Sequence, residues 1–131
     1  LLGDGECQEG QVWEAAMYAG YHKIKQLIAI IDYNKVQLAE NVKNTLDIEP
    51  LADKWRAFRW SVLECDGHDI ASLVSTIDEA NKQSKNRPVV VIAHTIKGKG
   101  VSFMENNYKW HGMAPNDKEF ADAMDELGGC L

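Results

Sequence analysis

The sequence contains no apolar segment long enough to cross a membrane. Its longest uninterrupted apolar runs are Leu27 to Ile31 and Val89 to Ala93, whereas a membrane-spanning helix needs about 20 apolar residues. No basic segment followed by an apolar one stands near the N-terminus, so no secretory signal is visible. These absences predict a protein with no membrane partner.

Positive charge is also scarce. The 131 residues carry 14 Lys and Arg against 20 Asp and Glu, which gives a formal net charge of −6. The basic residues form no stripe along the sequence. Because affinity for nucleic acid depends mainly on neutralising phosphates, we expect no nucleic-acid partner.

Cysteine is sparse, and Cys7, Cys65 and Cys130 stand far apart without CxxC spacing. This pattern excludes a zinc framework and argues against a disulfide scaffold. Reduced thiols are typical of the cytoplasm, which is the location that we expect. Only three prolines and ten glycines argue against a disordered linker. The chain opens on Leu1 rather than Met, in what reads as the end of a strand, so we expect a piece of a longer protein.

Short apolar runs alternate with amphipathic segments, and the composition of 45% apolar and 26% charged residues is that of one globular domain. The expected strands are a strand end at 1–2 and the runs 27–33, 60–65 and 89–95. The expected helices are 8–23, 50–58, 70–84 and 117–127, and Gly128-Gly129 ends the last of them. The expected loops include 34–44 and 97–112. Each strand is a continuous apolar run, as in parallel sheets buried on both faces. The sequence therefore predicts an α/β fold, a parallel sheet flanked by helices.

The loops that follow strands are the places to search for a site, because ligands of such sheets bind beyond the carboxyl ends of the strands. The first of these loops is Gly3-Asp4-Gly5-Glu6. Its glycines allow a ligand to approach backbone N–H groups, and the helix that begins after it attracts phosphate. Asp4 repels a bare phosphate unless a divalent metal lies between them.

Asn34 follows the next strand, 30 positions after Asp4. One βαβ unit takes about 30 residues, so the two side chains can converge at one end of the sheet. A carboxylate, an amide oxygen and a loop carbonyl near Val36 are suitable ligands for Mg²⁺, which also takes phosphate oxygens. The spacing favours a magnesium–diphosphate site, although Asp-Gly alone is also a common turn.

Two segments resemble transketolases. The stretch GDGECQEGQVWEAAMYAGYHKIKQLIAIIDYNKVQ, residues 3–37, resembles their thiamine-diphosphate-binding segment, which opens with Gly-Asp-Gly and closes with Asn. The stretch HTIKGKGVSFMENNYKWHG, residues 94–112, resembles especially the N-terminal subunit of the split, two-polypeptide form. The resemblance implies that residues 1–131 are part of the diphosphate-side domain of a thiamine-diphosphate enzyme, without its upstream part and its pyrimidine-side domain.

The resemblance also assigns roles to residues of the first motif. Asp4 and Asn34 match the side-chain metal ligands of the family, and the Val36 carbonyl matches the backbone ligand. The implied metal is Mg²⁺, with Ca²⁺ or Mn²⁺ as substitutes. Gly5 matches the glycine whose N–H approaches the diphosphate, and Glu6 belongs to the same cofactor-binding loop.

Three further residues match functional positions of the family. Glu9 and Glu14 match acidic residues of the dimer interface, although a helical glutamate is more often simply solvated. His111 matches a histidine that contacts the diphosphate and borders the donor-substrate channel, a catalytic position, although a histidine in a polar loop can also be structural. One residue departs from the family pattern: Tyr33 stands where many relatives have Asn or Asp, which alters the surroundings of Asn34.

The resemblance implies a dimeric or heterotetrameric enzyme of carbohydrate metabolism, in the pentose phosphate pathway. It would move a two-carbon ketol unit between sugar phosphates, with the C-terminal transketolase section as a separate chain or a missing domain. Two alternatives stay open: an enzyme like 1-deoxy-D-xylulose-5-phosphate synthase, and a non-catalytic α/β assembly subunit that has lost cofactor binding. A dehydrogenase is disfavoured because no GxGxxG run follows a strand.

Overall fold

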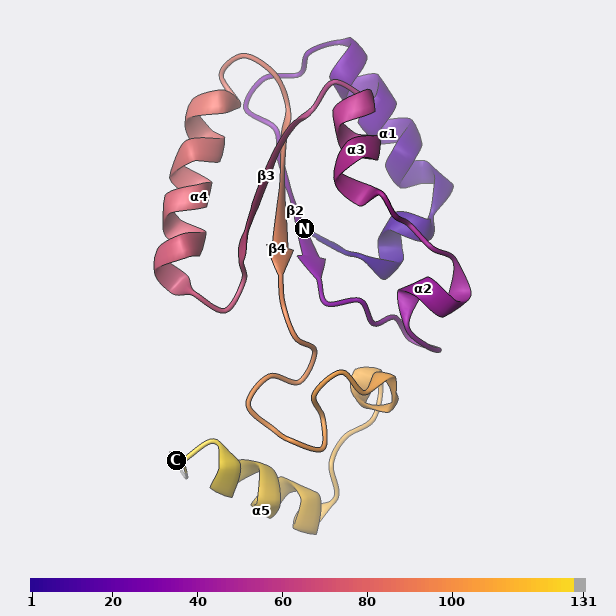
Figure 1. Ribbon diagram of the computed structural model, residues 1–131, viewed down its shortest axis with the longest axis vertical. Helices are drawn as coiled ribbons and strands as arrows, with labels where there is room; N and C mark the ends of the chain where they lie inside the picture. Colours follow the sequence, from indigo (N-terminus) through magenta and orange to yellow (C-terminus); the bar gives the residue numbers. More distant parts are fainter. Residues whose placement is uncertain (129–131) are drawn as a thin grey trace.

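The computed structural model describes residues 1–128 and is built on a four-stranded parallel sheet (Figure 1). The strands are β1 (Leu2–Gly3), β2 (Ile28–Tyr33), β3 (Ser61–Asp66) and β4 (Val89–His94), in the order β1-β2-β4-β3. The helices are α1 (Gly10–Tyr21), α2 (Val42–Thr45), α3 (Leu51–Ala57), α4 (Ile70–Gln83) and α5 (Asp117–Glu126), with 3₁₀ turns η1 (Gly5–Gln8) and η2 (Tyr108–His111). The predicted α/β fold with a parallel sheet is confirmed.

The core lies on both faces of the central strand β4, whose apolar residues are all buried. Side chains of successive strand residues point to opposite faces. Val90 and Ile92 therefore join the cluster that α1 and α3 cover, while Val89 and Val91 join the cluster that contains Ala80 of α4. Figure 1 shows α4 on one side of the sheet and α1 and α3 on the other.

Tryptophans on the α1 side of the sheet pack against each other and link α1 to β3. Trp55 and Trp60 are buried and meet edge to face, with ring centroids 4.8 Å apart. The indole N–H of Trp60 donates to the carbonyl of Ala16 at 2.8 Å, which ties α1 to the start of β3. Gly20 allows this approach, because a Cβ there would lie 1.8 Å from the Phe58 carbonyl oxygen.

Three details of the expected elements need correction. The expected helix 8–23 is divided into η1 and α1, because Glu9 has an extended backbone (φ −79°, ψ 130°). The expected loop 34–44 contains the start of the short helix α2. The expected loop 97–112 ends in η2, where the Asn107 side chain accepts from the Lys109 N–H. Gly128 has the left-handed conformation expected of a helix end, at φ 86°, and Gly129 and Cys130 lie outside the described residues.

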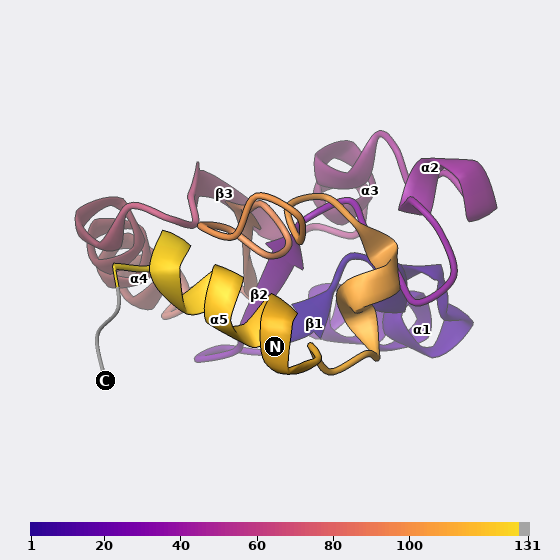
Figure 2. The ribbon, with the colours of Figure 1, turned by 90° about the horizontal axis from the view of Figure 1, so that it is seen from below.

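The chain after β4 passes across the carboxyl ends of the strands. In Figure 1 the segment from Thr95 to α5 lies below the sheet, and in Figure 2 it lies in front of the strand ends. Each predicted site loop therefore lies at this end of the molecule. Among residues 1–128, no helix combines the length and the apolar composition that a membrane crossing requires.

Candidate functional site

Asp4 is the most deeply buried charged residue of the predicted site, with 1% of its surface exposed. It follows β1, and its Oδ2 accepts the backbone N–H of Lys35. Its Oδ1 is buried and has no hydrogen-bond partner within the described residues. Burial raises the pKa of the Asp4 carboxyl to about 6, against the lowering effect of the backbone hydrogen bonds it accepts. A bound cation is one group that would satisfy this oxygen.

Asn34 lies beside Asp4 because β1 and β2 are parallel neighbours, with Gly3 opposite Asp32. The Asn34 side chain is buried. Its Oδ1 accepts the Val36 N–H at 2.9 Å, and its Nδ2 donates to Asp32 Oδ2 at 2.9 Å. The structure thus brings together the two side chains that the sequence assigns to the metal.

The loop after Asn34 is tightly closed around Val36. Val36 is buried and forms an antiparallel bridge with Asn41, and the Val42 N–H donates to the Lys35 carbonyl at 3.0 Å. Lys35 adopts a left-handed conformation (φ 65°), which is uncommon for a residue other than glycine. This conformation accompanies the hydrogen bond from the Lys35 N–H to Asp4.

Gly5 and Glu6, also predicted for cofactor binding, shape the first loop. A Cβ on Gly5 would lie 2.7 Å from Gln37 Cβ, so only glycine allows the two loops to approach this closely. The carboxylate of Glu6 is exposed and accepts the Gly3 N–H at 2.7 Å. Glu6 thereby holds the end of β1, and its contact with a cofactor stays a prediction.

His111 lies in η2, exposed, on the segment that crosses the strand ends. The neighbouring Gly112 lies close to the loop after β2, since a Cβ there would stand 3.8 Å from Leu38 Cδ1. Trp110 anchors the segment, because its indole N–H donates to the Phe103 carbonyl at 3.1 Å. His111 therefore lies near the loop after β2, which contains predicted metal ligands. Its catalytic role stays a prediction.

Glu9 and Glu14 are exposed, Glu9 as the N-cap residue and Glu14 within α1. Glu14 shares one helical face with exposed apolar side chains at i+3, i+4 and i+7. These are Met17, Tyr18 and Tyr21, which expose 56%, 61% and 68% of their surface. Such a patch is typical of an interaction surface, so the structure is compatible with the predicted interface, which stays a prediction.

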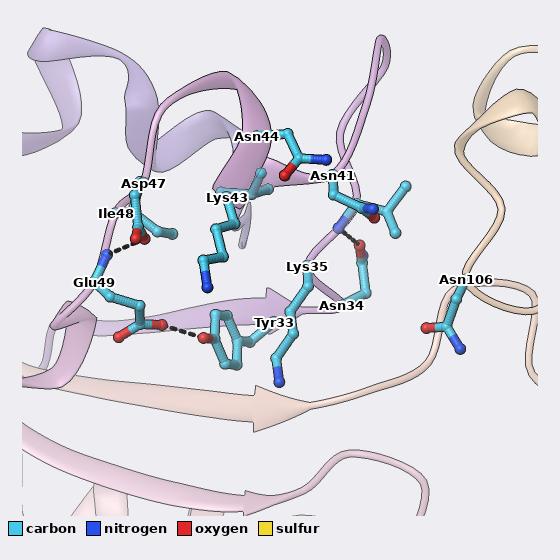
Figure 3. A pocket seen from close by; sticks show the side chains of 12 residues that line it. Tyr33, Asn34, Lys35, Asn41, Lys43, Asn44, Asp47, Ile48, Glu49 and Asn106 are labelled. Atoms are coloured by element: carbon cyan, nitrogen blue, oxygen red, sulfur yellow. Dashed lines mark hydrogen bonds between the residues drawn. The ribbon is translucent and has the colours of Figure 1, made fainter.

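A cavity of about 410 Å³ opens beside Asn34 (Figure 3). The Lys35 ammonium lies over the Tyr33 ring, 5.4 Å from its centroid, and the Tyr33 hydroxyl donates to the Glu49 carboxylate. Burial and this acceptor raise the pKa of Tyr33. Asn106 approaches from the segment after β4 and closes one side. Tyr33 therefore lines the cavity, and its hydrogen bond to Glu49 links the end of β2 to the segment that precedes α3.

The donor set fits magnesium better than a transition metal. No group of three or more His, Cys, Asp or Glu side chains in residues 1–128 is arranged to hold a metal. The predicted set instead comprises one carboxylate, one amide and one backbone carbonyl. Mg²⁺ is commonly bound by one or two carboxylates together with waters and the phosphates of a ligand. The buried Asp4 Oδ1 supplies the observation in this structure that fits such a cation.

The family described as "Transketolase, thiamine diphosphate binding domain" matches residues 1–129. The chain belongs to this family. It is 43% identical, over 127 residues and 97% of its length, to a 6-deoxy-6-sulfo-D-fructose transketolase subunit of Clostridium sp. (strain MSTE9). It is 46% identical, over 127 residues, to an apulose-4-phosphate transketolase subunit of Actinobacillus succinogenes. The predicted membership of the transketolase family is thereby confirmed.

The fold is likewise that of transketolases. The crystal structure of transketolase from Campylobacter jejuni matches 97% of the chain with a TM-score of 0.87 at 30% identity. Transketolase from Leishmania mexicana matches 96% with a TM-score of 0.86 at 26% identity. The chain spans 46% and 45% of the two relatives named above and 20% of the Campylobacter jejuni transketolase chain.

Two residues beside the candidate site were not predicted from the sequence. Asp32 bonds to Asn34, and the Thr95 hydroxyl donates to the other oxygen of the same carboxylate. Both residues stand at the carboxyl end of a strand, which is the signal that could have selected them. Their contact could not be read from the sequence, because 63 positions separate them.

Proposed function

We propose that this chain is the diphosphate-side part of a transketolase that binds thiamine diphosphate through a divalent metal, Mg²⁺ by preference. The single observation that carries the metal site is the buried Asp4 Oδ1, which has no partner in residues 1–128 and lies beside the Asn34–Val36 loop. A buried carboxylate oxygen without a partner is costly. A bound cation removes this cost.

Each residue of the site has a defined task in this proposal. Asp4, Asn34 Oδ1 and the Val36 carbonyl hold the metal, and the backbone at Gly5 approaches the diphosphate. His111 contacts the diphosphate from the segment after β4. When bound, thiamine diphosphate supplies the carbon nucleophile and the electron sink for transfer of a two-carbon ketol unit between sugar phosphates. The protein contributes by holding the cofactor in one orientation, which is a large part of catalysis.

A partner completes the enzyme in this proposal. Residues 1–131 form part of the diphosphate-side domain, and the C-terminal transketolase section is a separate chain or a further domain. The names of the relatives support this, since two of them are transketolase subunits of which the chain spans 46% and 45%. We assign the α1 face with Glu14, and Glu9 beside it, to the contact within a dimer or heterotetramer. The cysteine pattern supports a cytoplasmic enzyme.

Calorimetric titration of the full-length protein, assembled with its partner section, tests the proposal. Thiamine diphosphate should bind in the presence of Mg²⁺ and lose affinity when a chelator removes the metal. Asp4→Ala should abolish this metal-dependent binding, and Asn34→Ala should weaken it less because a neutral ligand is lost. Asp78→Ala removes an exposed carboxylate of α4 and serves as the matched control.

Two results would contradict the proposal. Unchanged affinity in the Asp4 variant refutes the metal site. Cofactor binding in the complete assembly without turnover of any sugar phosphate refutes the transferase and favours a non-catalytic subunit.

A further inference from the structure

Asp32 is the penultimate residue of β2 and lies between the two segments that build the site. Its neighbours across the sheet are Gly3 of β1 and Ala93 of β4. Its Oδ2 accepts from Asn34 Nδ2 at 2.9 Å, and its Oδ1 accepts from the Thr95 hydroxyl. Both carboxylate oxygens of Asp32 are thus occupied by donors, whereas Asp4 keeps one oxygen without a partner in residues 1–128.

The bonds to Asp32 and to the Val36 N–H together set which end of the Asn34 amide faces the metal-binding loop. A side-chain amide has a donor end and an acceptor end, and only the oxygen can bind a cation. Because Nδ2 donates to Asp32, Oδ1 is turned to the other side, where it accepts the Val36 N–H at 2.9 Å. A carbonyl oxygen has a second lone pair, which is left for the metal. Without Asp32, the Asn34 amide keeps the Val36 N–H contact but loses its second restraint, so it rotates more easily and can present its NH₂ group to the cation.

The second bond of Asp32 reaches the segment that carries His111. Thr95 opens this segment, and its backbone N–H donates to the Tyr33 carbonyl at 3.2 Å. Its hydroxyl adds the contact with the Asp32 carboxylate. One carboxylate therefore joins the loop after β2 to the segment after β4.

We propose that Asp32 is a positioning residue whose carboxylate orients the Asn34 amide oxygen toward the metal and ties that amide, through Thr95, to the segment of His111. The inference rests on the proposed metal site. Groups that orient metal ligands through hydrogen bonds typically change metal affinity 10–100-fold when removed. We expect a loss of this size when Asp32 can no longer accept both donors.

The experiment measures the affinity of Mn²⁺, followed by its electron paramagnetic resonance signal, in the full-length protein assembled with its partner section and thiamine diphosphate. Asp32→Asn keeps the shape of the side chain, but its amide has one acceptor oxygen for the two donors, Asn34 Nδ2 and the Thr95 hydroxyl. Mn²⁺ affinity should therefore fall about 10–100-fold. Thr95→Val removes only the second contact and should cause a smaller loss. Thermal melting of each variant verifies folding.

The reciprocal double variant, Asp32→Asn with Asn34→Asp, provides the sharpest control. The amide then donates to the carboxylate, so the hydrogen bond and the net charge are both restored, and a carboxylate oxygen faces the metal whatever its rotation. Mn²⁺ affinity should return toward the wild-type value. If Asp32→Asn alone fails to fold, the comparison of this double variant with the Thr95→Val variant and the wild type still decides the question.

Each remaining outcome has a definite meaning. A wild-type protein that binds no Mn²⁺ overturns the proposed metal site and this inference with it. Wild-type binding that Asp32→Asn leaves unchanged overturns the inference alone. A loss in Asp32→Asn as complete as in Asp4→Asn, without recovery in the double variant, shows that Asp32 is itself a ligand and overturns its positioning role.

Discussion

Gly5 lies where the loop after β1 meets the loop after β2, and the close approach of these loops sets the width of the site. The position that a Cβ would take is 2.7 Å from Gln37 Cβ. Real side-chain carbons do not approach this closely, so any other residue forces the loops apart. Asp4 directly precedes Gly5, and Asn34 stands three residues before Gln37, so the geometry of this contact affects the distance between the predicted ligands.

We predict that Gly5→Ala destabilises the protein by about 1–3 kcal/mol, the usual cost of overpacking, and weakens metal-dependent binding of thiamine diphosphate. Gly10→Ala is the matched control, because no atom lies within 4 Å of its added Cβ and the residue begins α1. Urea denaturation and calorimetric titration measure the two effects. Equal behaviour of the two variants would show that the contact with Gln37 is unimportant.

At the scale of elements, N-terminal capping hydrogen bonds set where α4 and α5 begin, in addition to the packing of their apolar faces. At the N-terminus of α4, the Asp69 side chain accepts the Ala71 N–H at 2.9 Å. At the N-terminus of α5, Asn116 and Glu119 form a complete capping box. By contrast, the N-cap residue of α1, Glu9, forms no side-chain cap, and η1 directly precedes it in the chain.

We predict that Asp69→Ala costs about 1 kcal/mol of unfolding free energy, because an N-cap acceptor is lost. Asp78→Ala changes the same charge on the same helix away from its end, so its effect should stay within about 0.5 kcal/mol. The midpoints of urea denaturation compare the two variants. Similar losses in both would assign the effect to charge rather than to capping.

At the scale of the whole molecule, the chain presents an apolar surface that its own helices do not cover. Met17, Tyr18 and Tyr21 of α1 are more than half exposed, and α1 lies at the outside of the sheet. The chain also spans only 20% of the transketolase of Campylobacter jejuni. Both observations fit an enzyme whose site is completed by other residues.

We predict that the 131-residue chain alone has no transketolase activity and at best weak affinity for the cofactor. An anchor for the diphosphate does not orient the reactive ring, and orientation supplies much of the rate. A coupled assay of glyceraldehyde 3-phosphate release from xylulose 5-phosphate and ribose 5-phosphate should show turnover only after the partner section is added. Steady turnover by the chain alone, unchanged by the partner, would refute the prediction.

The sequence by itself determined the fold class, and its spacing selected Asp4 and Asn34 as the pair of side-chain ligands that we propose. Continuous apolar runs such as 89–93 are local patterns that are typical of buried parallel strands. The 30 positions between Asp4 and Asn34 match one βαβ unit, whose length is set by local geometry. The resemblance to transketolases added the predicted roles of Gly5 and His111, because it relates residue types to a known site.

Only the tertiary structure decided the order of the strands and the contacts that this order creates. β4 lies between β2 and β3, and this places Thr95 beside Asp32, 63 positions away in the sequence. The contact of Gly5 with Gln37 and the cavity beside Asn34 likewise join segments from different loops. Local patterns cannot specify such contacts, because each depends on how several buried faces pack together at once.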